Sequence, residues 1–210
     1  MFGAHDLPLF ALSVLLLAIT PGPDTLYIVG RGSAHGWKWG AMAALGVGAG
    51  IFVHIFAAAV GLSAVLAASA TAFAVIKLIG AGYLIYIGIS LLLLRSSAPK
   101  AKPVKAARIS LRRVFAEGFL TNVLNPKVAL FFLAFIPQFI DAQAPNKALA
   151  FVFLGMVCNV IGTLWNLFTA WYAARMGDGL KRGNVRTWLN RGIGALFVLI
   201  GARLALTKLG

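Results

Sequence analysis

Long apolar runs dominate this chain of 210 residues and leave few folds open to it. A helix needs about 20 apolar residues to cross the hydrocarbon core of a membrane, and six stretches of that kind can be read along the sequence. Transmembrane strands are shorter and alternate in polarity, so unbroken runs favour helices. The predicted spanning helices are 7–29, 40–66, 72–94, 114–140, 148–172 and 189–206.

The overall composition supports a membrane protein. Hydrophobic residues make up 60% of the chain and charged residues only 11%, with a mean hydropathy of +0.90. A soluble core of this size does not need so much apolar sequence. Because little remains between the six segments, we expect an all-α, polytopic bundle that forms one transmembrane domain over residues 1–210. The single Cys158 excludes a disulfide framework or a cysteine metal site.

The formal net charge of +14 is concentrated in three connections. Lys and Arg cluster between the first and second, third and fourth, and fifth and sixth segments, whereas the other two connections carry almost no charge. Lys and Arg collect in cytoplasmic loops, so both termini are predicted to lie outside. The basic loops are expected to touch anionic lipid headgroups. Nucleic-acid binding is not expected, because no basic–aromatic recognition motif accompanies the charge.

The first predicted helix is interrupted by the sequence Thr-Pro-Gly-Pro-Asp at residues 20–24. Proline removes a backbone donor, and its ring clashes with the preceding turn. In lipid, the freed carbonyls must find partners in protein or in a water-lined cavity. A broken helix with an acid at the break is typical of a site that binds a small polar or ionic ligand inside a membrane. The fourth predicted helix carries a similar break, Asn-Pro-Lys at residues 125–127.

The longest polar connection, residues 95–113, divides the six helices three and three. An odd number of spans in each half makes the second half enter the membrane from the opposite side, so related halves would form an inverted repeat. Aligning Pro23 with Pro126 places Asp24 opposite Lys127. We therefore predict an inverted repeat of residues 1–94 and 114–210, with proline-broken first and fourth helices and a basic cytoplasmic loop between the halves.

The two charges at the breaks, Asp24 and Lys127, are the first candidates for a site. They could hold the two ends of a zwitterion or exchange a proton during transport. Alternatively, they form a static ion pair, or Lys127 extends to the interface while Asp24 caps a helix. Whether they touch is left open, because residue counting places Asp24 nearer the cytoplasm. The predicted substrate-binding or translocation residues are Pro21, Gly22, Pro23, Asp24, Asn122, Asn125, Pro126 and Lys127.

Asp24, His54 and Glu117 are the candidates for proton coupling. His54 follows Gly46 and Gly50 at four-residue spacing, so it should point into a close helix contact. Histidine titrates near neutral pH and could relay protons, although a packing role is more common. Glu117 starts a polar face that leads to the fourth-helix break, and it could instead form a salt link with neighbouring arginines. No metal cluster can be assembled from the histidines, and no cofactor is expected.

Several of these motifs together resemble one family of membrane carriers. They are the first break, the glycine-rich second helix with its histidine, the run 125–132, and Phe-Ile-Pro-Gln-Phe at 135–139. The pattern is similar to the LysE superfamily, and within it to the RhtB (homoserine/threonine exporter) branch, over nearly the whole chain. The resemblance implies a multi-pass exporter of amino acids or close derivatives in the bacterial inner membrane, driven by the proton gradient. Asp24 is a departure, because this family often has asparagine or another residue there.

We therefore expect an exporter and not an enzyme. A membrane enzyme needs a convergent nucleophile, base or metal set, and five acidic residues spread along the chain supply none. A channel or facilitator for a small polar solute or ion is the main alternative, although a cation channel would use more intramembrane carboxylates. The breaks argue against a purely structural protein. Expected partners are the solute and the lipid bilayer, and faces of small residues would permit a homodimer.

Overall fold

The computed structural model describes residues 2–62, 109–141 and 143–176, together with isolated helical positions within 75–93 and 195–206. Every element named in these parts is a helix or a helical turn. The chain is therefore an all-α bundle, as predicted. The third and sixth predicted spans, and the basic connections next to them, lie largely outside the described residues.

The first predicted span consists of two helices joined at a sharp bend. α1 (Leu7–Ile19) and α2 (Pro23–His35) meet at 57°. Pro23 lies in the first turn of α2, where a missing N–H is tolerated because the first N–H groups of a helix have no partner within it. Gly22 precedes it in an extended conformation. α2 extends to His35, past the predicted end at residue 29. The predicted end comes too early because the last turns of the helix are polar, and a boundary drawn from hydropathy does not include them.

The fourth predicted span is broken in the same way. α6 (Leu111–Val123) meets the stretch Pro126–Phe139 at 46°. That stretch begins as α7 (Pro126–Leu130) and continues as a π-helical turn, η2 (Phe131–Phe135), and a 3-10 turn, η3 (Ile136–Phe139). The prediction that proline breaks the first and fourth helices is confirmed.

Two continuous helices accompany the broken ones. They are α3 (Trp37–Ala57), extended by the π-helical turn η1 (Ala58–Leu62), and α8 (Lys147–Met176). Each is long and apolar enough to cross a membrane, and the described residues contain up to four spans if each broken pair counts as one. The chain is thus a multi-pass membrane protein.

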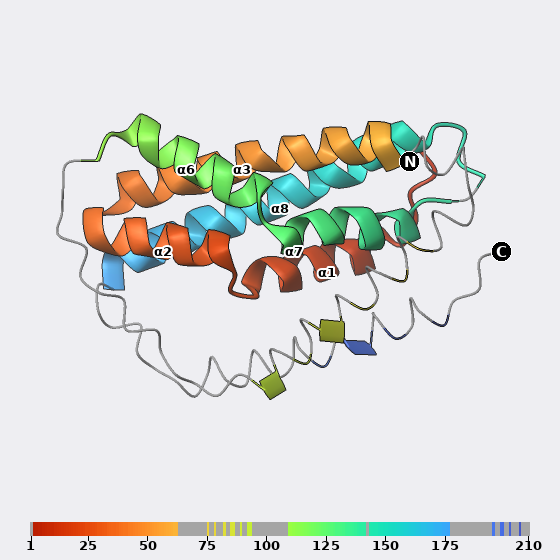
Figure 1. Ribbon diagram of the computed structural model, residues 1–210, viewed down its shortest axis with the longest axis horizontal. Helices are drawn as coiled ribbons and strands as arrows, with labels where there is room; N and C mark the ends of the chain where they lie inside the picture. The colour runs from red at the N-terminus through yellow and green to blue at the C-terminus, as the bar shows by residue number, and fades with distance from the viewer. Residues whose placement is uncertain are drawn as a thin grey trace.

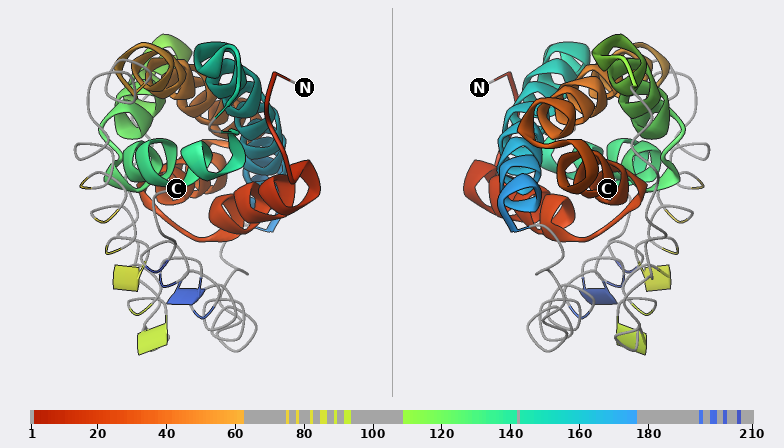
Figure 2. Two further views of the ribbon diagram at one scale, coloured as in Figure 1. Left: turned by 90° about the vertical axis from the view of Figure 1, so that its right-hand side faces the viewer. Right: turned by 90° about the vertical axis from the view of Figure 1, so that its left-hand side faces the viewer.

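The two broken spans run in opposite directions, side by side (Figure 1). α1 lies beside α7 and α2 lies beside α6, so the two breaks meet near the middle of the bundle. α3 and α8 pack along them, and the end-on views of Figure 2 show the four described spans gathered together. An inverted repeat requires such opposite directions. The repeat itself stays a prediction, since the third member of each half lies largely outside the described residues.

Glycines allow α3 and α6 to approach closely. A Cβ added to Gly118 would lie 2.6 Å from the carbonyl oxygen of Ala43, and one added to Gly50 would lie 2.8 Å from the Cβ of Asn122. His54, one turn after Gly50, is buried in the same contact. The small residues on this face of α3 therefore pack against α6 within the subunit, as their spacing indicates.

Two apolar clusters lie on either side of the breaks. One surrounds α1, η2, η3 and the first half of α8, and its buried phenylalanines are Phe10, Phe131, Phe132, Phe135, Phe139 and Phe151. The other joins α2, α3, α6 and the second half of α8 through residues such as Ile28, Val47, Val114 and Ala170. The polar groups at the breaks are thus enclosed between two apolar regions, where unpaired polar atoms are unfavourable.

Candidate functional site

Lys127 closes the break in the first span. An α-helical carbonyl accepts from the N–H four residues later, and for Leu17 that residue is Pro21, which has no N–H. The Lys127 ammonium takes this place, donating to the carbonyl of Leu17 at 2.8 Å and to that of Thr20 at 2.7 Å. A cation is also favourable at the C-terminus of a helix such as α1. The lysine on α7 thereby holds the two broken spans together.

The proline in the fourth span also removes the usual N–H donor of a helical carbonyl, and different groups lie against that carbonyl. Pro126 deprives the carbonyl of Asn122 of its helical donor. The carbonyl oxygen accepts instead from the backbone N–H of Asn125 at 2.9 Å, and Nε2 of His54 lies 3.0 Å from the same oxygen. Because a carbonyl only accepts, this contact fixes the proton on Nε2. Asn125 completes the break by capping α7, since its side-chain oxygen accepts from the backbone N–H of Lys127 at 3.0 Å.

Asp24 contacts the other broken span through Asn122. The side-chain amide of Asn122 donates to Oδ2 of Asp24 at 2.9 Å. Oδ1 of Asp24 and Oδ1 of Asn122 are both buried without a hydrogen-bond partner. The ion pairs found among the described residues do not join Asp24 to Lys127. The lysine is held instead by backbone carbonyls, so a static ion pair does not lock the two breaks.

A cavity of about 60 Å³ lies where the breaks meet. On this measure a water molecule needs about 10–15 Å³, so the space holds a few waters. Its polar wall consists of Asp24, Thr25, Asn122, Asn125, Lys127 and Asn166. Its apolar wall includes Val14, Leu17, Ile51, Val128, Phe131 and Phe132. The cavity thus offers charges, amides and an apolar surface within one small space.

The structure brings most of the predicted site residues to this cavity. Gly22, Asp24, Asn122, Asn125 and Lys127 line it, whereas the three prolines shape the breaks around it. Sequence reasoning did not select the wall residues from α1 and α3. Their apolar side chains resemble any other lipid-facing or core residue in sequence, so they carry no signal of their own.

His54 is connected to the cavity through Asn122. The structure does not place His54 among the lining residues. Its ring is buried and packs against Phe132, with ring centroids 5.8 Å apart. Asn122 therefore contacts His54 through its backbone carbonyl and Asp24 through its side chain, which links two of the three proton-coupling candidates.

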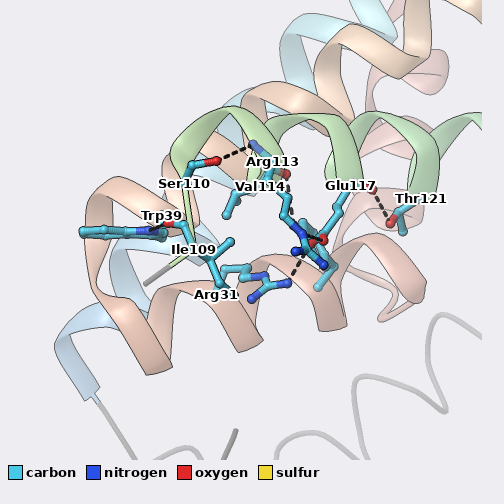
Figure 3. Close-up of polar contacts among 9 residues, drawn as sticks. Arg31, Trp39, Ile109, Ser110, Arg113, Val114, Glu117 and Thr121 are labelled. Carbon is cyan, nitrogen blue, oxygen red and sulfur yellow. Dashed lines mark hydrogen bonds and ion pairs between the residues drawn. The ribbon is translucent and has the colours of Figure 1, made fainter. Parts of the chain in front are cut away.

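Glu117, the third candidate, lies in a separate network between α2 and α6 (Figure 3). Its carboxylate accepts from Arg31 at 2.6 Å, from Arg113 at 2.8 Å and from the hydroxyl of Tyr27 at 2.9 Å. Arg113 is the kind of neighbour expected from the sequence, one turn away on the same helix. Arg31 and Tyr27 come from the other broken span, and sequence reasoning missed them. Glu117 does not line the cavity.

Two proline-broken helices run through the bundle in opposite directions and meet at a small cavity with charged and apolar walls. Many membrane transporters form their solute sites in this way. The sequence model of the LysE type translocator family matches residues 15–208. The chain belongs to this family, and the resemblance noted from its motifs is confirmed.

Curated relatives match the chain over nearly its full length. It is 30% identical to a leucine efflux protein of Enterobacter sp. (strain 638), covering 97% of each chain. It is 31% identical to a homoserine/homoserine lactone efflux protein of Salmonella typhi, over 93% of this chain and 94% of the relative. An uncharacterized membrane protein of Pseudomonas aeruginosa is 30% identical over 99% of this chain and 98% of its own length. No solved structure matches the chain.

Proposed function

We propose that this protein exports amino acids or small amino-acid derivatives across the bacterial inner membrane, and that the cavity between the breaks is the substrate site. The observation that carries the proposal is the meeting of both breaks at one small space lined by Asp24, Lys127 and an apolar wall. Carriers of this architecture bind small solutes at broken helices near the bilayer midplane. Efflux relatives named for leucine and for homoserine support an amino-acid substrate.

The two halves, residues 1–94 and 114–210, are proposed to move against each other around this site within a single domain. The basic connections would be cytoplasmic and both termini periplasmic, as the charge pattern predicts. In that orientation the Glu117 network joins α2 to α6 on the cytoplasmic side of the cavity. Its ion pair would have to open whenever the site faces the cytoplasm.

Proton coupling is proposed to occur at Asp24. A proton and a cationic substrate group are alternative partners for its carboxylate, so protonation from outside would release the substrate there. The other titratable groups near it are Lys127 on the cavity wall and His54 behind Asn122, and Thr25, Asn125 and Asn166 add polar groups to the same cavity. Glu117 is held between Arg31 and Arg113, which favours a structural role for it. No Gly-rich nucleotide-binding loop occurs in the sequence, and this supports a gradient as the energy source.

Efflux from proteoliposomes tests the proposal. Vesicles are loaded with single labelled amino acids or dipeptides, and efflux is followed with and without an imposed pH gradient. We expect efflux of at least one amino acid that responds to the gradient, needs no ATP and stops with a protonophore. Efflux that ignores protons and only follows the solute gradient would favour a facilitator. Absence of efflux for the whole panel would contradict the proposal.

A further inference from the structure

We propose that Oδ1 of Asp24 and Oδ1 of Asn122 form a subsite for a protonated primary amine, and that the substrate needs this amine but does not need a free carboxylate. The substrate class is then small primary ammonium compounds with an apolar or neutral substituent, which includes amino acids, their amides and their lactones. This inference rests on the cavity being the transport site, as proposed above.

The two oxygens are acceptors that lack donors. The amide orientation of Asn122 is fixed, because its Nδ2 donates to Oδ2 of Asp24 at 2.9 Å. Its Oδ1 therefore remains an acceptor, and Asn122 is only 1% exposed. Oδ1 of Asp24 is also buried and unpartnered. Within the described residues, these are the unpaired buried side-chain oxygens, and both residues line the cavity. A buried acceptor is unfavourable until a donor reaches it.

An ammonium group fits this pair of acceptors. It presents three donors and a positive charge, so it can satisfy more than one acceptor and balance the carboxylate. A neutral amide or hydroxyl group would supply a donor without the charge. A carboxylate placed here would meet only acceptors and a like charge. The amine end of a zwitterion is therefore assigned to Asp24 and Asn122.

Lys127 is the natural partner for a substrate carboxylate, but it is already engaged. It is the one cationic side chain among the described residues that line the cavity. Two of its three N–H donors go to the carbonyls of Leu17 and Thr20. If Lys127 turned to a carboxylate, the Leu17 carbonyl would lose its donor, because Pro21 cannot supply one. Only the third N–H of Lys127 is free for a substrate carboxylate, so we infer that the carboxylate contributes less to binding than the amine does.

The remaining wall suits an apolar substituent. This part of the cavity is formed by Leu17, Val128, Phe131 and Phe132. Apart from Asp24 and Lys127, the described residues that line the cavity carry no charge. A side chain of aliphatic size would replace water against this surface. The cavity must widen to take one, since in this conformation it holds only a few waters.

Competition in proteoliposomes tests the inference. Efflux of labelled L-leucine or L-homoserine, whichever is faster, is measured with internal unlabelled L-leucine, L-leucinamide or N-acetyl-L-leucine at a pH where the amines are protonated. We expect leucinamide to compete within a few fold of leucine, and N-acetyl-leucine to compete at least about tenfold more weakly. Equal competition by N-acetyl-leucine, or failure of leucinamide, would overturn the inference and leave amino-acid export intact.

The proposed export of amino acids and the proposed amine subsite can also be tested separately. If neither amino acid leaves the vesicles, the proposed function fails. Thermal unfolding of the purified protein then decides the inference alone. Stabilisation by leucinamide and not by N-acetyl-leucine would support the amine subsite, and any other pattern would overturn it.

A charge-neutral variant supplies a check on the assignment. Asp24→Asn keeps the shape of the side chain but removes the charge. In thermal unfolding of the purified variant, we expect it to abolish the preference for leucinamide over N-acetyl-leucine as a stabilising ligand. The matched control is Asp141→Asn, because Asp141 is an exposed residue beyond η3. Folding of both variants is verified by their unfolding temperatures. A preference that survives in Asp24→Asn would overturn the assignment of the amine to this residue.

Discussion

His54 lies against the carbonyl of Asn122, whose helical donor Pro126 removes, with Nε2 of the histidine 3.0 Å from the oxygen, and the backbone N–H of Asn125 donates to the same oxygen at 2.9 Å. The other break repeats the arrangement, because Lys127 supplies the donor that Pro21 denies to Leu17. In both cases a side chain from a different span completes the broken helix. A neighbouring span therefore stabilises each break, which joins the shape of the site to the packing of the bundle.

The Pro21–Lys127 relation predicts a specific rescue. Lys127→Met should lower the free energy of unfolding by about 1–3 kcal/mol, because a buried carbonyl loses its donor. Pro21→Ala restores an N–H, so the double variant should recover part of that stability. Thermal or chemical unfolding in detergent measures both effects. Additive losses in the double variant would show that Lys127 does not serve the carbonyl freed by Pro21.

A similar test separates packing from proton transfer at His54. His54→Gln keeps a side-chain donor near the Asn122 carbonyl, whereas His54→Leu removes it. Because the Asn125 N–H still donates to that carbonyl, we expect the leucine variant to lose about 0.5–1.5 kcal/mol of stability and the glutamine variant less. If proton-driven efflux persists in His54→Gln, the histidine acts only as a donor to the break. Loss of coupling with stability unchanged would assign it to proton transfer.

The Arg31–Glu117 pair should contribute more than the Arg113–Glu117 pair. The side chain of Arg31 is 19% exposed and that of Arg113 is 72% exposed, and exposed pairs contribute about 0–1 kcal/mol. We expect a double-mutant cycle of Arg31→Ala and Glu117→Ala to show a coupling of about 1 kcal/mol or more. The cycle with Arg113→Ala is the control and should give a smaller value. Equal couplings would contradict the importance of the α2–α6 contact.

The charge pattern makes a prediction about topology. Single cysteines at Ser97 and Gly183, which lie outside the described residues, should react only from the cytoplasmic side. A cysteine at Gln143, in the connection before α8, should react from the periplasmic side. Labelling with a membrane-impermeant reagent in intact and opened cells measures this. Periplasmic labelling at Ser97 or Gly183 would reverse the proposed orientation.

The breaks are the part of this structure that sequence predicts best. Proline and glycine act locally, and counting four residues back from Pro21 and Pro126 identifies the freed carbonyls of Leu17 and Asn122. The partners that complete the breaks come from other helices. Sequence places His54 on the correct face of α3, since its glycine spacing indicates close packing, but it does not show which carbonyl the ring contacts.

Other features depend on tertiary packing and could not be predicted. Arg31 and Glu117 are 86 positions apart, and only the arrangement of the two broken spans brings them together. The same holds for Asp24 and Asn122. Aligning the two breaks correctly placed Asp24 opposite the second one, but its direct partner there is the asparagine before the proline and not the lysine after it.

Proton-driven efflux by the Asp24→Asn variant tests the central claim most directly. Wild type, Asp24→Asn and the control Asp141→Asn are reconstituted at equal density and loaded with the labelled amino acid that wild type exports fastest. A pH gradient is then imposed. The account predicts fast, gradient-dependent efflux for wild type and Asp141→Asn, and a loss of at least about tenfold for folded Asp24→Asn. Efflux by Asp24→Asn at the wild-type rate, with the same response to the gradient, would contradict it.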